Sequence, residues 1–263
     1  MVCSWRLMVD IHCHLLPGID DGPATLDEAL KMAEAAIAGG ITHVVATPHA
    51  NDTYDFDPER VRALRQEVAR HLGGRLMLAT GADFHVNLQN LKALEQNPAA
   101  YTVNQKNYLL VEFSEFSIPP SMDQTLHQLQ LARLMPVITH PERNGIIRSH
   151  PERLARWVHQ GCTAQVTGGA LTGAFGRHTQ KIAEQWIAQG LIHFVASDAH
   201  NLKGRPLELR PAYEAVKERQ GEEVARALLV ENPLAAFEGR PLPYIPEVQE
   251  TPTRRRRKRF FFF

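Results

Sequence analysis

Residues 7–14 of this 263-residue chain read LMVDIHCH, a short apolar run that ends in two histidines. The pattern predicts a buried strand over 7–11 with polar side chains at its carboxyl end. His12 and His14 are two residues apart, so on an extended chain they share a side, while Cys13 points the other way. We therefore expect a packed thiol at Cys13 and a pair of imidazoles able to grip one ion or two adjacent ions.

The same unit, an apolar strand followed by a helix, recurs along the chain. Strands are predicted over 7–11, 41–46, 76–79, 108–113, 136–139, 162–166 and 192–196. Helices are predicted over 26–38, 58–72, 88–96, 123–134, 152–160, 180–189, 206–219 and 222–230. Strands that alternate with helices imply a parallel sheet, and seven such units without an evident linker imply closure into a barrel. We predict an α/β fold, a TIM-like (β/α)7 barrel over 1–248, and a disordered basic and aromatic tail over 249–263.

Residue types that bind metal ions follow six of the seven predicted strands. They are His12 and His14, His49, Asp83, Glu112, His140, and the pair Asp198 and His200. The carboxyl ends of barrel strands meet at one face, so these side chains should gather there. Only the sixth strand, which ends in Gln165, Val166 and Thr167, offers no strong ligand type. Imidazoles and carboxylates without thiolate favour Zn, Mn or Fe, and so many ligands favour two or three ions.

Each of these residues also has an ordinary structural alternative. An isolated His49 or His140 is more often a structural histidine than a ligand. Asp198 is a residue type favoured at helix N-caps. Asp83 and Glu112 are each able to pair with a surface arginine. All of these alternatives would have to be correct at the same time at six strand ends, so we favour the metal site.

Other histidines and cysteines receive simpler interpretations. His43 and His193 lie in predicted strands and are expected to pack, and His85 is a candidate for lining the pocket because it follows Asp83 by two residues. The three cysteines are odd in number and form no CxxC motif, which favours reduced thiols in a cytosolic protein. No Cys-x5-Arg sequence occurs, so a phosphatase mechanism through a covalent thiophosphate is not expected.

The charge of the chain is unevenly distributed. Six of its 29 basic residues lie in 254–259, which leaves 23 basic residues against 29 acidic ones in the rest. A body of this charge has no general attraction for nucleic acid. The polybasic run beside aromatic residues at 254–263 is of the kind that lies on an anionic membrane, and a cloning remnant or a disordered tail is the alternative. No apolar run is long enough for a membrane span, so we expect a cytoplasmic protein, with the tail offering peripheral contact at the inner face of the membrane.

Six segments together resemble one known group of proteins. They are DIHCHLLPGIDDGP at 10–23, ATPH at 46–49, TGADFH at 80–85, LLVEFS at 109–114, VITHPER at 137–143 and ASDAHNLKGRP at 196–206. In this order they resemble the PHP (polymerase and histidinol phosphatase) superfamily, and within it the bacterial protein-tyrosine phosphatases of capsule and exopolysaccharide operons. The resemblance spans nearly the whole chain except the tail, and it implies a distorted seven-unit barrel.

The resemblance also implies how the ligands are shared. The first ion would be held by His12, His14 and Asp198, the second by Glu112 and His140, and the third by Asp21, His49 and His200. Asp83 falls where the family has a bridging Glu; because Asp is one methylene shorter, the alternatives for this bridge are that it is lost, tightened or restored by backbone movement. Asp20 is adjacent to Asp21 and is the alternative ligand for the third ion.

Removal of phosphate from phosphotyrosine is the activity that the resemblance implies, on a tyrosine kinase that controls polysaccharide export. Arg143 and Arg205 are candidate phosphate clamps, since a guanidinium matches phosphoryl oxygens. Asp198 and His200 are candidates for any general acid. The alternatives are a small-molecule phosphatase acting on a substrate such as histidinol phosphate, a PHP nuclease, and a non-catalytic, metal-stabilised partner-binding module, which only Asp83 favours.

Overall fold

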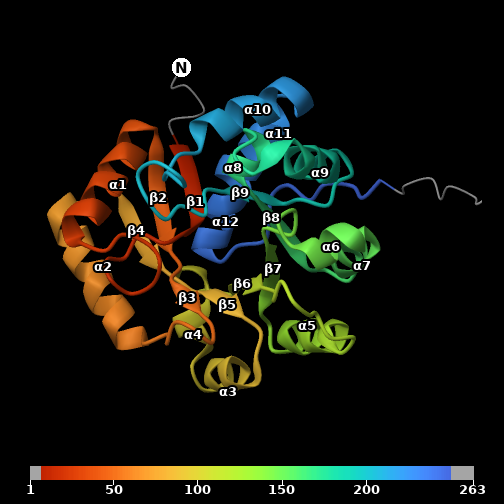
Figure 1. Cartoon of the computed structure of the whole chain (residues 1–263), viewed down its shortest axis with the longest axis horizontal. Coiled ribbons are helices and arrows are strands. Elements are labelled where there is room, and N and C mark those ends of the chain that lie inside the picture. The colour runs from red at the N-terminus through yellow and green to blue at the C-terminus, as the bar shows by residue number, and fades with distance from the viewer. Residues whose placement is uncertain (1–6, 250–263) are drawn as a thin grey trace, which may run out of the picture.

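The computed structural model of the chain describes residues 7–249. In Figure 1 the strands lie in the middle of the molecule and most helices lie around them. The predicted tail over 249–263, with its proposed membrane contact, lies outside the described residues except for Gln249. Cys3 lies outside them as well. Within residues 7–249, no helix is both long and apolar enough to cross a membrane.

The strands form two parallel sheets. One has the order β1 (Met8–Cys13), β2 (Ile41–Ala46) and β4 (Met77–Thr80). The other has the order β3 (His49–Ala50), β5 (Asp83–His85), β6 (Tyr108–Glu112), β7 (Met135–Thr139), β8 (Thr163–Thr167) and β9 (Phe194–Ala196). All pairs of neighbouring strands are parallel, as the alternation of strands and helices predicts.

The two sheets meet at two junctions, one formed by the chain running from β2 to β3 and from β4 to β5, and one formed by backbone hydrogen bonds. On one side β3 follows β2 after two residues and β5 follows β4 after two residues, and the amide of Gly81 donates to the carbonyl of Ala46 at 3.0 Å. On the other side the amide of Asp198 donates to the carbonyl of His12, and the amide of His14 donates to the carbonyl of Ala199, both at 2.8 Å. The seven predicted strand positions are therefore all occupied, in a ring that is interrupted where β2 and β4 break.

Helices α1 (Leu26–Ala38), α2 (Pro58–Leu72) and α3 (Leu88–Gln96) occupy the predicted ranges. Thr25 begins α1 with a capping box: its side chain accepts from the amide of Glu28, whose carboxylate accepts from the amide of Thr25. The remaining helical segments are α4 (Pro98–Tyr101), η2 (Val103–Gln105), α5 (Met122–Leu131), α6 (Gly145–Ser149), α7 (Pro151–His159), α8 (Gly168–Leu171), α9 (Gly176–Ala188), α10 (Arg210–Gln220), α11 (Glu222–Arg226), η3 (Ala227–Glu231) and α12 (Asn232–Glu238).

Three predicted helices differ from the structure in a bound or in helix type. The helix predicted over 123–134 ends at Leu131, because Arg133 adopts a left-handed backbone conformation with φ of +63°. The helix predicted from 206 begins at Arg210. The side chain of Asn201 accepts hydrogen bonds from the amides of Lys203, Gly204 and Arg205 and holds this segment in a turn. The helix predicted over 222–230 is a short α-helix followed by a π-helical turn.

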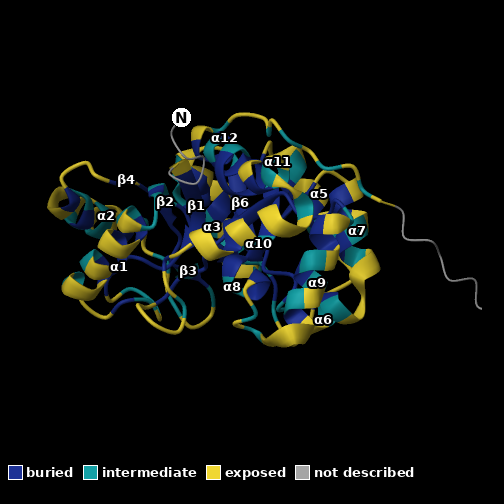
Figure 2. Cartoon of the chain, turned by 90° about the horizontal axis from the view of Figure 1, so that it is seen from above, coloured by how far each residue is buried: buried dark blue, intermediate teal, exposed yellow. Residues whose placement is uncertain are grey.

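Two apolar clusters surround the strands, and Figure 2 shows the buried residues concentrated in the strands and on the inner faces of the helices. The larger cluster lies between strands and outer helices. In the smaller one, Val9 and Ile11 of β1 pack with Tyr108, Phe194 and Phe237. Phe237 belongs to α12, so this helix contributes to the inner core.

Candidate metal centre

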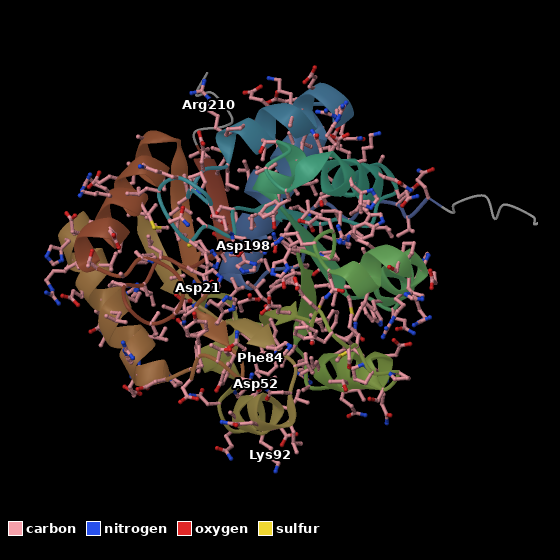
Figure 3. The ribbon with its side chains drawn as sticks, viewed as in Figure 1. Asp21, Asp52, Phe84, Lys92, Asp198 and Arg210 are labelled. Atoms are coloured by element: carbon pink, nitrogen blue, oxygen red, sulfur yellow. The ribbon has the colours of Figure 1, made fainter. Side chains whose placement is uncertain are left out.

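The residues predicted as metal ligands come together at the carboxyl ends of the strands. Figure 3 places Asp21 and Asp198 near the middle of the molecule. Within the described residues, four groups have ligand atoms all within 4.8 Å of one another. They are His14, Asp21, His49 and His200; His12, His140 and Asp198; His12, His14 and Asp83; and His49, Asp83 and Glu112. All nine predicted ligands therefore belong to at least one group.

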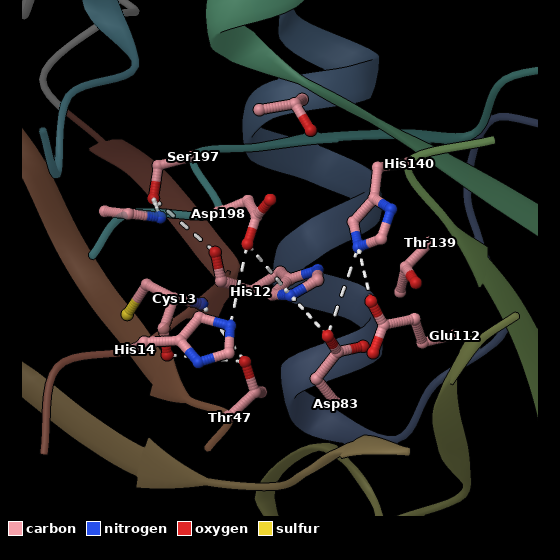
Figure 4. A network of polar contacts seen from close by, with 12 residues as sticks. His12, Cys13, His14, Thr47, Asp83, Glu112, Thr139, His140, Ser197 and Asp198 are labelled. Atoms are coloured by element: carbon pink, nitrogen blue, oxygen red, sulfur yellow. Dashed lines mark hydrogen bonds and ion pairs between the residues drawn. The ribbon is translucent and has the colours of Figure 1, made fainter. Parts of the chain in front are cut away.

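Asp83 contacts both His12 and His140 in the cluster (Figure 4). Its Oδ2 lies 3.5 Å from Nε2 of His12, 3.4 Å from Nδ1 of His49 and 4.0 Å from Nε2 of His140. The side chain is fully buried, and neither carboxylate oxygen has a hydrogen-bond partner among the described residues. A buried carboxylate surrounded by three imidazoles is suited to bridging cations, although it is one methylene shorter than glutamate.

Glu112 and His140 form a second part of the cluster, next to Asp83. Oε1 of Glu112 is 3.8 Å from Nε2 of His140, and its Oε2 is 3.6 Å from Nδ1 of His49. Glu112 ends β6 and His140 directly follows β7, so neighbouring strands supply this pair. His140 has a φ of +31°, and Asp198 has a φ of +52°. Non-glycine residues rarely adopt such backbone conformations, and they cluster at functional sites.

A third part of the cluster involves Asp21, whose Oδ1 lies 3.4 Å from Nε2 of His49 and 3.3 Å from Nε2 of His200. Asp20 has a different position. Its Oδ2 accepts a hydrogen bond from Nδ1 of His14 at 2.7 Å, and its Oδ1 accepts from the amide of Gly22. The structure thus distinguishes the two carboxylates: Asp21 faces the shared space and Asp20 orients an imidazole.

Asp198 connects the imidazoles to the two arginines. Its Oδ1 lies 3.4 Å from Nε2 of His12 and 3.5 Å from Nε2 of His14. Its Oδ2 accepts hydrogen bonds from both Arg143 and Arg205. The guanidinium of Arg143 also lies over the ring of Phe175, 4.7 Å from its centroid. The two predicted phosphate clamps are therefore fixed at the edge of the cluster.

Three of the clustered histidines are held through Nδ1. His12 contacts Oε1 of Gln165 at 3.0 Å, His14 contacts Asp20, and His200 contacts the backbone carbonyl of Asp198 at 2.9 Å. An oxygen acceptor at Nδ1 fixes the proton there and leaves Nε2 as the electron-pair donor. Nε2 of all three has no hydrogen-bond partner within the described chain.

Gln165 was missed by the sequence analysis, which left the sixth strand without a role in the site. It lies on β8, is fully buried, and reaches His12 from 153 positions away in the chain. An amide is a weak metal ligand, so its residue type carries no ligand signal. Its contribution is detectable only when β1 and β8 are placed in the same barrel.

The charges of the cluster favour bound positive charge. Burial opposes protonation of His12, but the adjacent Asp83 and Asp198 outweigh it and raise its pKa to about 9. Burial likewise opposes ionisation of Asp83 and Asp198. The surrounding imidazoles nevertheless hold the pKa of Asp83 well below its ordinary range, and imidazoles together with Arg143 do the same for Asp198. The same balance of charges stabilises divalent cations.

The donor set fits divalent metal ions. Buried ligand atoms with no hydrogen-bond partner in the described chain include Nε2 of His12, His14 and His200, Nδ1 of His49, and both carboxylate oxygens of Asp83. Unpartnered buried polar atoms are costly, and here they converge. Nitrogen and carboxylate oxygen suit Zn, Mn and Fe.

The remaining predicted positions lie outside the ligand groups. Cys13 packs in the larger apolar cluster, and its Sγ lies 3.6 Å from the carbonyl of Val45, as expected for a packed thiol. Neither Cys13 nor Cys162 forms a disulfide in the described part of the chain. His193 is buried and His43 is half-buried, with its ring 5.1 Å from that of Phe237. His85 ends β5, half-buried, and is in none of the four groups.

The fold and the site together define a parallel α/β protein with a buried cluster of candidate metal ligands at the strand ends. The chain belongs to the CpsB/CapC family of capsular polysaccharide synthesis, whose model matches residues 8–238.

Several relatives are similar over most of their length. YwqE of Bacillus subtilis, a tyrosine-protein phosphatase, is 37% identical over 233 residues, which cover 86% of this chain and 89% of YwqE. CpsB of Streptococcus pneumoniae, also a tyrosine-protein phosphatase, is 28% identical over 86% of this chain and 96% of its own. A solved structure from work on these metal-dependent tyrosine phosphatases superposes with a TM-score of 0.85 and 33% identity, over 93% of this chain and 100% of the other.

A more distant structural relative supports only the fold. The dihydropyrimidinase of Brevibacillus agri superposes with a TM-score of 0.53 at 14% identity, over 87% of this chain and 69% of that enzyme.

Proposed function

We propose that this protein is a metal-dependent protein-tyrosine phosphatase. The observation that carries the proposal is the sharing of Asp198 between the two halves of the site: one oxygen faces His12 and His14, and the other binds Arg143 and Arg205. A phosphoryl group that binds both the cations and the arginines has its place next to this carboxylate. The tyrosine phosphatase activity of the relatives YwqE and CpsB supports the substrate class.

The residues that would hold two or three divalent ions, Mn, Fe or Zn, are those of the four ligand groups. Such ions supply a hydroxide near neutral pH and stabilise charge on the phosphoryl oxygens. Arg143 and Arg205 bind phosphoryl oxygens through planar guanidinium groups, which have geometry suited to phosphate. Asp198 holds both guanidinium groups in place before substrate arrives. The leaving tyrosine has an ordinary pKa near 10, so its departure needs little proton donation.

The physiological substrate that we propose is a phosphotyrosine kinase that regulates polysaccharide export. The family's assignment to capsular polysaccharide synthesis supports this partner class. A non-catalytic binding module is not favoured, because its one supporting feature, Asp83, still reaches three imidazoles. Relative turnover of a phosphotyrosine peptide, histidinol phosphate and an oligonucleotide separates the phosphatase from the small-molecule and nuclease alternatives.

Replacement of His140 tests the site directly. The His140→Ala variant should lose about 100-fold or more in kcat/KM on a phosphotyrosine peptide, the scale of removing one preorganised charge-stabilising group. The barrel should stay folded, because His140 lies at a strand end and not in an apolar cluster. Exposed His127 on α5 provides the matched control, and His127→Ala should keep full activity. Normal turnover by purified, metal-loaded His140→Ala protein would contradict the assignment.

A further inference from the structure

A cavity of about 240 Å³ lies beside the arginine side of the metal centre. It is bordered by α8, the start of α10 and the segment 203–206, and Figure 1 shows α8 and α10 near each other. Its wall is mainly apolar, formed by Gly168, Gly169, Ala174, Phe175, Pro206 and Ala212. None of the nine metal-ligand candidates lines it.

Two contacts connect this cavity to the candidate phosphate clamps. Arg205 lines the cavity and also donates to Asp198. Phe175 lines it as well, and its ring lies under the guanidinium of Arg143. A phosphotyrosine whose phosphate is held by both arginines would therefore place neighbouring parts of its peptide at the mouth of the cavity.

The size of the cavity limits its occupant. Ligand pockets for whole small molecules have volumes of about 300–1,000 Å³. This cavity is smaller, and it suits one amino-acid side chain. Of the charged residues on its wall, Arg205 is bound to Asp198, and Lys203 is matched by Glu208, so charge does not select a strongly acidic or basic side chain. The wall of glycine, alanine, proline and phenylalanine selects an apolar one.

We propose that this cavity is a specificity subsite, which binds an apolar side chain, aliphatic or aromatic, adjacent to the phosphotyrosine in the substrate protein. This inference rests on the proposed phosphatase function and deepens it. The subsite contributes to recognition of peptides and is not used by a substrate that lacks flanking residues.

The test compares peptides with and without such a side chain. Wild-type, metal-loaded protein is assayed on phosphotyrosine peptides with alanine on both sides, and with leucine or phenylalanine on one side or the other. One of the apolar peptides should have kcat/KM about fivefold or more above the alanine peptide, because burial of a few methylene groups has that effect. Absence of any preference would overturn the subsite.

A variant whose side chain fills the cavity tests whether the cavity causes the preference for apolar peptides. Ala174 is exposed on the connection between α8 and α9, so Ala174→Trp should fold normally. It should abolish the preference for the apolar peptide and leave turnover of para-nitrophenyl phosphate unchanged. The matched control is Ala63→Trp, at an exposed position of α2 that does not line the cavity. It should behave as wild type.

Two results with Ala174→Trp would overturn the proposal. If the preference persists, the cavity is not the subsite; if para-nitrophenyl phosphate turnover also falls, the cavity accommodates the phenyl ring instead. Failure of the proposed function would look different, because wild-type protein would then hydrolyse neither para-nitrophenyl phosphate nor any peptide.

Discussion

Three histidines of the metal centre are oriented by three different kinds of acceptor. Gln165 offers an amide oxygen to His12, Asp20 offers a carboxylate to His14, and the backbone of Asp198 serves His200. A carboxylate acceptor increases the basicity of an imidazole more than a neutral amide does, so His14 should be the stronger electron-pair donor of the first two. The acceptors therefore set both the tautomer and the ligand strength of each ring.

Gln165 provides a test of this orientation. Gln165→Leu removes the acceptor at Nδ1 of His12 and should weaken metal binding about 10- to 100-fold, as outer-shell replacements do. Gln165→Glu keeps an oxygen at that position and should retain tight binding. Titration of each metal-free protein with a divalent ion against a competing chelator dye measures the difference. Equal affinity of wild type and Gln165→Leu would show that Gln165 has no orienting role.

The loop after β7 shows how a single element positions several functional groups. It carries His140 and Arg143, and it ends at Asn144, the N-cap of α6. The side-chain oxygen of Asn144 accepts from the amides of Ile146 and Ile147. Its amide donates to the carbonyls of residues 113 and 114, which follow β6. This buried side chain therefore ties the loop to the neighbouring strand end.

Replacement of Asn144 should affect stability and the site together. Asn144→Ala removes a helix cap and leaves buried carbonyls without a donor, so the free energy of unfolding should fall by about 2 kcal/mol or more. Asn144→Asp keeps the cap acceptor, but it places a buried carboxylate oxygen against the two carbonyls that accept from Asn144, so it should be destabilised as well. Urea unfolding of the three proteins gives both differences. An Asn144→Ala protein as stable as wild type would rule out this anchoring role.

Most of the fold was predictable from the sequence because local signals agreed with it. Thr25 and the two glycines after α1 fix the bounds of that helix, and the seven apolar strand segments give the barrel units. Elements that depend on distant contacts were not predictable. The packing of Phe237 against β1 and the contact of Gln165 with His12 join segments far apart in the chain. The clustering of most candidate ligands was predictable because they lie at strand ends that face the same side, whereas Asp21 followed only from the family resemblance.

The stability of the whole molecule should depend on pH through a histidine remote from the metal centre. Burial lowers the pKa of His193 to about 4, and the ring in its neutral form accepts a hydrogen bond from the amide of Ala164. The unfolded chain binds a proton at this residue near pH 6.5. The neutral ring of His193 therefore contributes its full share to the free energy of unfolding above pH 6.5. This contribution is lost as the pH falls from 6.5 towards 4.

The expected loss from His193 is about 3 kcal/mol between pH 7 and pH 4. His193→Asn keeps an acceptor near the amide of Ala164 and cannot be protonated in this range, so its stability should fall less on acidification. Urea unfolding of both metal-free proteins at several pH values isolates the contribution. Identical pH dependence of the two proteins would mean that His193 is not held neutral.

The metal content of the protein tests the central claim most directly. Elemental analysis of wild-type protein purified without chelators should find two or three divalent ions per chain. Chelator treatment should remove the ions and abolish hydrolysis of para-nitrophenyl phosphate. Addition of Mn, Fe or Zn should restore the hydrolysis. Full hydrolysis by protein with less than one ion per chain would contradict a mechanism based on the clustered imidazoles and carboxylates.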